Sequence, residues 1–187
     1  MAALSREYYA CLLGKHQILG GLHIITVSDI YYPDESYYNQ QGVAALRVSG
    51  DFLRERLIEL SQRIDVDTMI DVHTHPFSTG NVWFSGTDDR DEINFTTYLR
   101  DEIEAEIFYA SIVLSQTDYK ARFWSLDNGG RAVQTPAMIK TQKLSEAIPS
   151  SDGFGKKIVR IRLTTRCLIG ACGRSGSTPC ALSPAGK

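Results

Sequence analysis

The sequence predicts one domain of the α/β or α+β class, in which helices flank a mixed β-sheet. Three observations support this class. The length of 187 residues suits a single domain with a real hydrophobic core, and 43% of the residues are apolar. Strand-like and helix-like segments alternate along residues 1–150, whereas residues 151–187 lose this pattern. We therefore expect a domain over 1–150 followed by a tail over 151–187.

Two strands are expected to open the domain, at 8–14 and 19–32, and to turn at Gly20-Gly21, because glycine pairs favour tight turns. The polar segment 33–42 then reads as a loop. A short strand is expected at 43–49.

The rest of the domain alternates between helix and strand. Residues 51–64 carry apolar side chains at the spacing of one helical face, namely Leu53, Leu57, Leu60 and Ile64. Residues 68–75 form a short apolar run that is typical of a buried strand. The segment 85–103 reads as a helix whose first turn is rich in carboxylates, as the helix dipole favours. Residues 106–115 and 118–127 predict a hairpin of two strands.

The charge distribution argues against binding to nucleic acid. Residues 153–187 hold seven Lys/Arg and no Asp/Glu, which leaves 13 basic against 22 acidic residues in 1–152. Such a body repels phosphate backbones. The tail is basic, rich in Gly, Ser and Pro, and aperiodic, so we expect it to be disordered. The sequence has neither a long apolar run nor a secretory signal, so we expect a cytoplasmic protein without membrane contact.

The stretch HTHPFSTGNVWFSGTD gathers residue types that bind zinc. Catalytic zinc takes three protein ligands from His, Asp or Glu and keeps a fourth position for water. His73 and His75 end the expected strand and, being two apart, share one face of it. Asp88, Asp89 and Asp91 begin the following helix, and Asp88 is the best candidate for the third ligand.

A hydrolytic zinc site also needs a general base and a donor that stabilises the oxyanion. Ser85 is a candidate donor, and Glu7, a lone acid in an apolar stretch, is a candidate base. Each feature has a simpler interpretation. The histidine pair can be polar residues that leave a strand, Ser85 with Asp88 can be a helix N-cap, and Glu7 can face solvent. Taken together, the features favour the metal site. By contrast, His16 and His23 are expected at the surface or core edge rather than as ligands.

At this point the residues resemble a known pattern. His73–Asp88 is similar to the H-x-H-P…S-x-x-D motif of the JAMM (MPN+, JAB) metalloproteases, whose other signature is a glutamate ahead of a G-L-L-G-like strand. Here EYYACLLG offers that partner, with Glu7 and Gly14 at the required spacing. The resemblance covers about residues 5–150. It implies an MPN/JAB-type, cytidine-deaminase-like fold with a mixed sheet flanked by helices.

Members of this family use one zinc to cleave the bond after the C-terminus of ubiquitin or a ubiquitin-like protein. The resemblance implies that His73, His75 and Asp88 hold Zn²⁺, that Glu7 is the general base and that Ser85 stabilises the oxyanion. It further implies that the partner is a ubiquitin-like protein or its conjugate. The duplicated SGTDDRDE suits a bacterial branch of the family, in which a ubiquitin-activating-type adenylating enzyme accompanies this domain.

Trp83 and Phe84 are candidates for gripping substrate, because their loop must pass the metal. Two other functions compete with the protease. Metal-dependent hydrolases of the barrel type also begin with H-x-H, but they need ligands from later strands, and no histidine follows His75. A non-catalytic MPN-like interaction scaffold is the second rival. Such scaffolds usually lack the histidines or the serine, so the enzyme is favoured.

Overall fold

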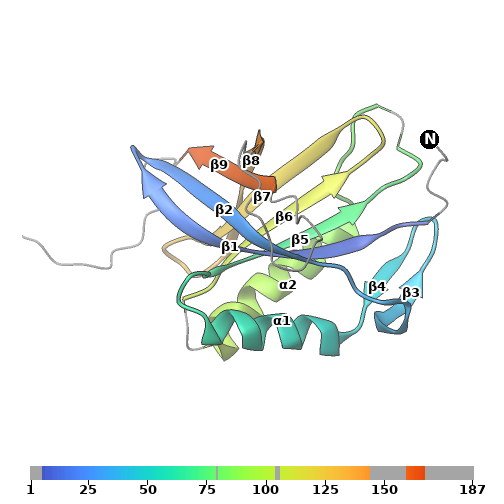
Figure 1. Ribbon diagram of the computed structural model, residues 1–187, viewed down its shortest axis with the longest axis horizontal. Helices are drawn as coiled ribbons and strands as arrows, with labels where there is room; N and C mark the ends of the chain where they lie inside the picture. The colour runs from blue at the N-terminus through green and yellow to red at the C-terminus, as the bar shows by residue number, and fades with distance from the viewer. Residues whose placement is uncertain (1–5, 79, 104–105, 144–158, 167–187) are drawn as a thin grey trace, which may run out of the picture.

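The structure is a computed structural model that describes residues 6–78, 80–103, 106–143 and 159–166. Its elements alternate strands with two α-helices (Figure 1). In chain order they are β1 (Tyr9–Leu19), β2 (Leu22–Tyr31), the 3₁₀ turn η1 (Glu35–Tyr37), β3 (Tyr38–Gln41), β4 (Leu46–Val48), α1 (Gly50–Gln62), β5 (Thr68–Thr74), α2 (Gly86–Glu102), β6 (Phe108–Leu114), β7 (Tyr119–Leu126), β8 (Ala132–Lys143) and β9 (Val159–Arg166).

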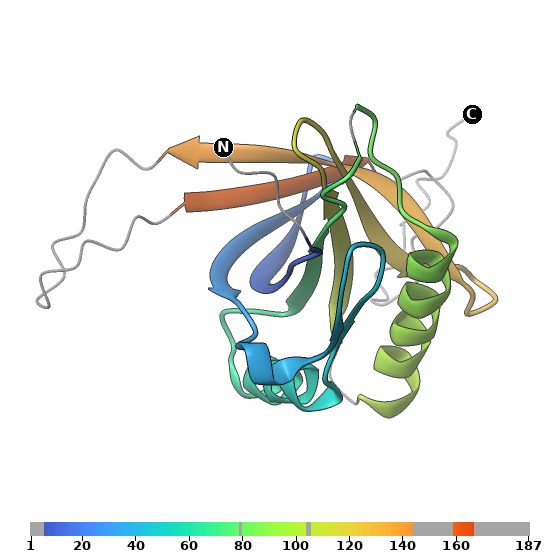
Figure 2. The ribbon, with the colours of Figure 1, turned by 90° about the vertical axis from the view of Figure 1, so that its right-hand side faces the viewer.

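Seven of these strands form one sheet in the order β1-β2-β9-β8-β7-β6-β5, which closes on itself because β5 also pairs with β1. In Figure 2, β1 and β2 accordingly face β6 and β7 across the interior of the closed sheet. β8 and β9 complete the sheet between β2 and β7. The β5–β6 pair is parallel, whereas the other neighbouring pairs are antiparallel. The sheet is therefore mixed, and the α+β class is confirmed in this general form.

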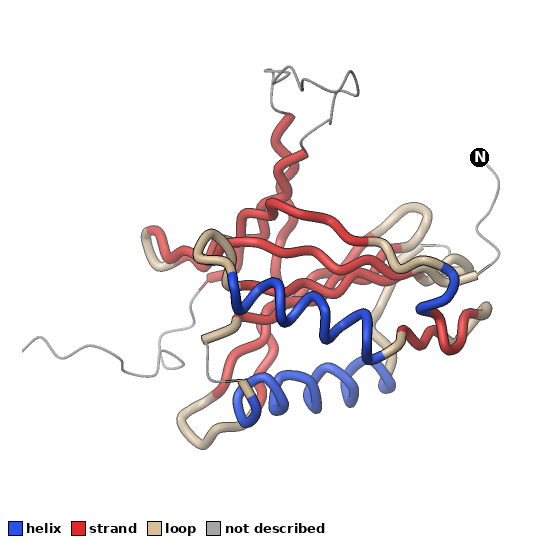
Figure 3. Tube along the Cα trace, turned by 60° about the horizontal axis from the view of Figure 1, so that its bottom comes forward, coloured by secondary structure: helices blue, strands red, loops and turns tan. Residues whose placement is uncertain are grey.

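Helix α2 is the crossover that a parallel pair of strands requires, because it connects the end of β5 to the start of β6. Both helices lie together on one side of the sheet (Figure 3). This connection places the start of α2 close to the end of β5. The two halves of the zinc motif occupy those two positions.

The opening hairpin forms as predicted, although β1 continues to Leu19 instead of ending at residue 14. Its turn residues Gly20 and Gly21 have φ values of 58° and 75°, which glycine adopts without strain. Gly14 lies at a register shift between β1 and β2, where a Cβ atom would come within 2.7 Å of the Thr26 carbonyl oxygen. Only a residue without a side chain fits there.

The core has two layers, one on each face of the sheet. Adjacent residues alternate between them, so Leu12 and Ile70 belong to the layer enclosed by the sheet, while Leu13 and Met69 pack towards the helices. The helices contribute Phe52, Leu57, Leu60 and Leu99 to the second layer. Because the histidine-bearing face of β5 also points towards the helices, the site lies between the sheet and α2.

Three expectations about the elements need correction. Ile64 is 95% exposed, because α1 ends at Gln62 and the chain has left the helical path. The segment 33–42 is not simply a loop: its second half is β3, which pairs with β4. β4 itself is shorter than the strand expected over 43–49.

The tail also differs from expectation, because residues 159–166 form β9 and pair with both β2 and β8. An ordered strand here supplies hydrogen-bond partners to two backbone edges that would otherwise be open. Residues 151–158 and 167–187, on which the expectation of disorder also bears, lie outside the described residues. Within the described part of the chain, neither helix combines the length and hydropathy needed to cross a membrane.

Candidate metal centre

The end of β5 is held on both sides by its neighbours, which fixes the two histidines. On the β1 side, the Thr74 amide donates to the Tyr8 carbonyl oxygen at 3.0 Å and the Tyr8 amide donates to Thr74 Oγ1 at 2.8 Å. On the β6 side, the His75 amide donates to the Leu114 carbonyl oxygen at 2.7 Å. His73 and His75 therefore project from a rigid backbone on one face.

Asp88 is placed by the capping box that begins α2. Ser85 Oγ accepts a hydrogen bond from the Asp88 amide at 3.2 Å, and Asp88 Oδ2 accepts one from the Ser85 amide at 2.5 Å. This arrangement folds the carboxylate back over the first turn. The N-cap interpretation of this pair is thus correct, and it coexists with the position that a metal ligand needs.

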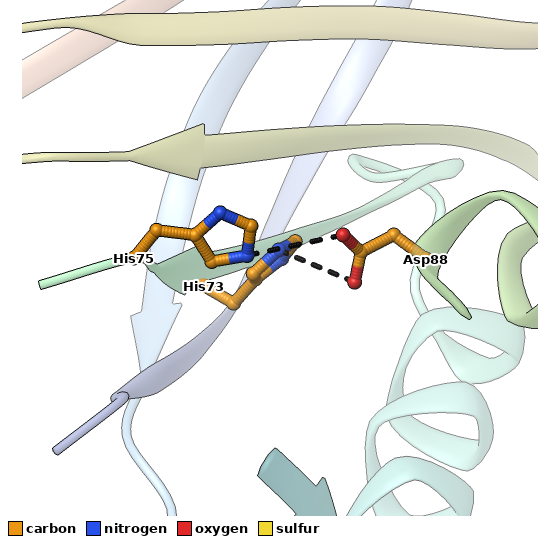
Figure 4. Close-up of side chains that lie close together, drawn as sticks. All are labelled: His73, His75 and Asp88. Carbon is orange, nitrogen blue, oxygen red and sulfur yellow. Dashed lines mark ion pairs between the residues drawn. The ribbon is translucent and has the colours of Figure 1, made fainter. Parts of the chain in front are cut away.

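The structure brings the three predicted ligands together (Figure 4). His73 Nε2 lies 3.5 Å from Asp88 Oδ1, and His75 Nε2 lies 3.9 Å from Asp88 Oδ2. One ligand atom from each residue falls within 4.8 Å of the other two. Two imidazoles and one carboxylate with this convergence fit the ligand set of a catalytic zinc site.

The surroundings of the two histidine rings also support a metal site. His73 Nε2 is buried and has no hydrogen-bond partner among the described residues, a costly state that a bound cation would relieve. The ring of His75 hydrogen-bonds to the Trp83 backbone, which is the kind of outer contact that orients a metal-ligating imidazole. Its Nε2 remains directed at Asp88.

The charges of the site are tuned by burial and by each other. Burial alone would raise the pKa of Asp88, but the His73 contact and the Ser85 hydrogen bonds outweigh it and hold that pKa well below its ordinary value. Burial, followed by the charge of His73, lowers the pKa of His75. A charged carboxylate beside a neutral imidazole is the protonation state in which both groups bind metal.

Glu7 lies in the same cavity as the three ligands, which has a volume of about 830 Å³. Its side chain is only 9% exposed, so the solvent-facing alternative is wrong. Its amide donates to the Gly42 carbonyl oxygen and its own carbonyl oxygen accepts from the Gln41 side chain, both at 2.8 Å. Burial raises the pKa of Glu7, and although His73 opposes this, Asp88 adds to it.

The cavity is also lined by Ser85, but the two aromatic residues before it differ in role. Trp83 is 66% exposed, with Lys120 Nζ 5.0 Å from its ring centre. Phe84 instead meets the His73 ring edge-on at 6.1 Å and stacks under Arg122 at 3.7 Å. Neither ring lines the cavity: Trp83 is exposed outside it, whereas Phe84 packs between His73 and Arg122.

Two buried polar groups next to the site escaped the reading of the sequence. Asp71 lies on β5 and accepts hydrogen bonds from the Tyr9 and Tyr109 hydroxyls, and burial raises its pKa to about 6 although these bonds oppose the shift. Glu92 and Arg122 form a buried ion pair. Spacing could have indicated two of these residues: Asp71 is two before His73 on the strand, and Glu92 is one helical turn after Asp88.

Comparison of the sequence with models of protein families and with curated proteins gives no match in either case. The site geometry and the motif residues therefore carry the functional argument.

Proposed function

We propose that this chain is a zinc-dependent isopeptidase or peptidase that hydrolyses the bond after the C-terminus of a ubiquitin-like protein. The proposal extends to the fold, as a variant of the MPN/JAB type, and to a cytoplasmic location. The observation that carries it is the meeting of His73, His75 and Asp88 in one cavity with a buried Glu7. A metal-binding triad that lacked an adjacent base would support binding alone.

His73, His75 and Asp88 would hold the zinc ion, which when bound supplies Lewis acidity to water and to the scissile carbonyl group. Glu7 accepts the proton of the attacking water and later delivers it to the leaving amine. Its raised pKa brings it closer to neutral pH, where such a transfer is efficient. Ser85 donates a hydrogen bond from its hydroxyl group to the oxyanion that develops on the carbonyl oxygen.

The substrate class follows from the motif. An extended C-terminal tail that leads to the cavity can contact the Trp83 ring, which is exposed outside the cavity lining and offers an apolar surface. A second partner in the same pathway would be a ubiquitin-activating-type adenylating enzyme. Such an enzyme uses the free C-terminal glycine that the cleavage exposes.

The test uses a panel of C-terminally extended ubiquitin-like proteins with the wild-type chain, Glu7→Gln and His75→Ala. Wild type should bind one zinc per chain and cleave at least one substrate. Glu7→Gln should keep its zinc but lose about 10²- to 10⁴-fold in turnover, because only proton transfer is removed. His75→Ala should lose both.

Glu102→Gln is the matched control, because Glu102 is exposed at the far end of α2 and should behave as wild type. Equal turnover by wild type and Glu7→Gln would remove Glu7 from the mechanism. Wild-type protein that takes up no zinc would reject the enzyme and favour the MPN-like scaffold.

A further inference from the structure

We propose that Arg122 is a positioning residue of the metal centre, which holds the first turn of α2 so that Asp88 faces the two histidines. This inference rests on the proposed function, since it assigns a role toward the same metal. Arg122 lies on β7, far from the zinc motif in sequence, and its side chain is only 5% exposed.

Arg122 contacts both carboxylate oxygens of Glu92. Its Nε donates to Glu92 Oε2 at 2.9 Å, and its Nη2 lies 2.9 Å from Glu92 Oε1. The Nε contact is a charge-assisted hydrogen bond, whereas Nη2 forms an ion pair without hydrogen-bond geometry, so one directional bond joins Arg122 to α2 here. Glu92 Oε2 also accepts hydrogen bonds from Trp124 Nε1 at 2.6 Å and from the Ser111 hydroxyl.

The other contacts of Arg122 lie on both sides of the capping box that contains Asp88. Its Nη1 donates to Asp89 Oδ1 at 2.5 Å, and the guanidinium covers the Phe84 ring at 3.7 Å. Asp89 follows Asp88 directly, and Phe84 precedes the capping residue Ser85. Arg122 thus contacts Phe84, which comes just before the capping residue Ser85, and Asp89, which comes just after the ligand Asp88.

These contacts constrain the two ways in which Asp88 could move away. The Glu92 pair sits one helical turn beyond Asp88 and prevents α2 from rotating about its axis. The Asp89 and Phe84 contacts prevent the cap from lifting off the sheet. Nη1 also donates to Gln134 Oε1 at 2.7 Å, which ties the same guanidinium to β8. If Arg122 served only to neutralise the buried Glu92, its contacts with Asp89 and Phe84 around the cap would have no purpose.

The test compares Arg122→Met and Arg122→Lys with wild type in zinc affinity, measured by chelator competition, and in the absorption spectrum of the cobalt-substituted protein. Arg122→Met should bind zinc about 10- to 100-fold more weakly, the range for lost outer contacts of metal ligands, and should shift the cobalt bands. Arg122→Lys restores the charge but not the forked guanidinium, so its affinity should be intermediate. Arg63→Met is the matched control, because Arg63 is also a partly buried arginine with several ion pairs, to Asp29, Glu59 and Asp65, none of which lines the cavity.

A second comparison tests the proposal if Arg122→Met does not fold. The Asp89 side chain is 49% exposed, so Asp89→Asn should fold. It should weaken zinc binding more than Asp101→Asn, which removes an equal charge from an equally exposed side chain of the same helix that pairs with Arg100 instead of Arg122. Equal effects of these two substitutions would overturn the proposal. So would an Arg122→Met protein that is less stable but keeps the wild-type zinc affinity and cobalt spectrum, because Arg122 would then be merely structural. If the wild-type protein itself does not bind zinc, the proposed function is overturned too. If wild type binds zinc and the Arg122 and Asp89 variants bind it equally well, only the role of Arg122 is overturned.

Discussion

Ser85 caps α2, and the proposed function gives the same hydroxyl group a second task as oxyanion donor. Its oxygen accepts the hydrogen bond of the Asp88 amide and so caps α2. Its proton is not used by that bond and can be donated to an oxyanion in the cavity, which Ser85 lines. The structural and the chemical interpretations of this residue are therefore not exclusive.

Ser85→Ala should cost both stability and rate. Loss of the cap should lower the free energy of unfolding by about 1 kcal/mol. Loss of an oxyanion donor should lower kcat by about 10²- to 10³-fold. Denaturant unfolding and steady-state kinetics of the zinc-loaded protein measure the two effects.

Ser49→Ala separates the two effects, because Ser49 caps α1 in the same way, with its Oγ accepting from the Phe52 amide at 3.3 Å. This control should lose similar stability and keep its kcat. If Ser85→Ala also kept its kcat, Ser85 would be a cap only.

At this scale the residues that local spacing connects could be predicted, whereas those that only the fold connects could not. His73 with His75 and Ser85 with Asp88 follow from strand and helix periodicity. Arg122 is 30 positions from Glu92, and nothing local in the sequence indicates which buried carboxylate it meets. Trp83 and Phe84 show the same limit, since only the fold determines that Trp83 is exposed while its neighbour Phe84 is half-buried.

Among the elements, the β1–β2 hairpin was predicted because a glycine pair and apolar runs act locally. Where elements end depends on tertiary pairing, so β1 continues through His16, which was expected at the surface or core edge. His16 Nε2 in fact lies 2.8 Å from His23 Nδ1 across the hairpin, and its ring packs against Phe108 at 4.1 Å. The pair is half-buried at the edge of the enclosed core layer.

This histidine pair should make the stability of the protein depend on pH. Burial lowers the pKa of both rings, and the neighbouring His23 lowers that of His16 further although Asp67 opposes it. The unfolded chain takes up these protons near the ordinary value of 6.5, before the folded state does. The free energy of unfolding should therefore fall as the pH drops below about 6.5, and level off below the lowered pKa values.

His16→Phe tests this expectation, because phenylalanine keeps a ring beside Phe108 and cannot be protonated. Zinc-free protein is used for both, so that metal release does not contribute. Between about pH 7 and pH 5, wild type should lose more stability than the variant in denaturant titrations. Parallel curves for the two proteins would show that the pair does not titrate in this range.

For the whole molecule, closure of the sheet was the feature hardest to predict. The composition of the tail, rich in Gly and Ser, suggested disorder, although Val159–Arg166 alternates apolar with polar residues as a strand does. The alternation was overlooked because it is short and lies among residues of loop-like composition. Of the two strands that pair with β9, β8 is near it in the sequence and β2 is far from it. No local signal in the sequence indicates that one strand pairs with both.

If β9 closes the sheet, a backbone change within it should weaken the whole domain. Leu163 is opposite Ile25 in β2 and Ile139 in β8, so it belongs to both ladders. Leu163→Pro removes a ladder donor and should lower the free energy of unfolding by about 1–3 kcal/mol, the cost of leaving its partner carbonyl unpaired. Leu163→Ala keeps the amide and isolates the effect of the side chain. A proline variant no less stable than the alanine variant would show that the domain holds together without this strand. A larger loss of stability in the proline variant, with faster hydrogen exchange in β2 and β8, would show that β9 is integral to the sheet.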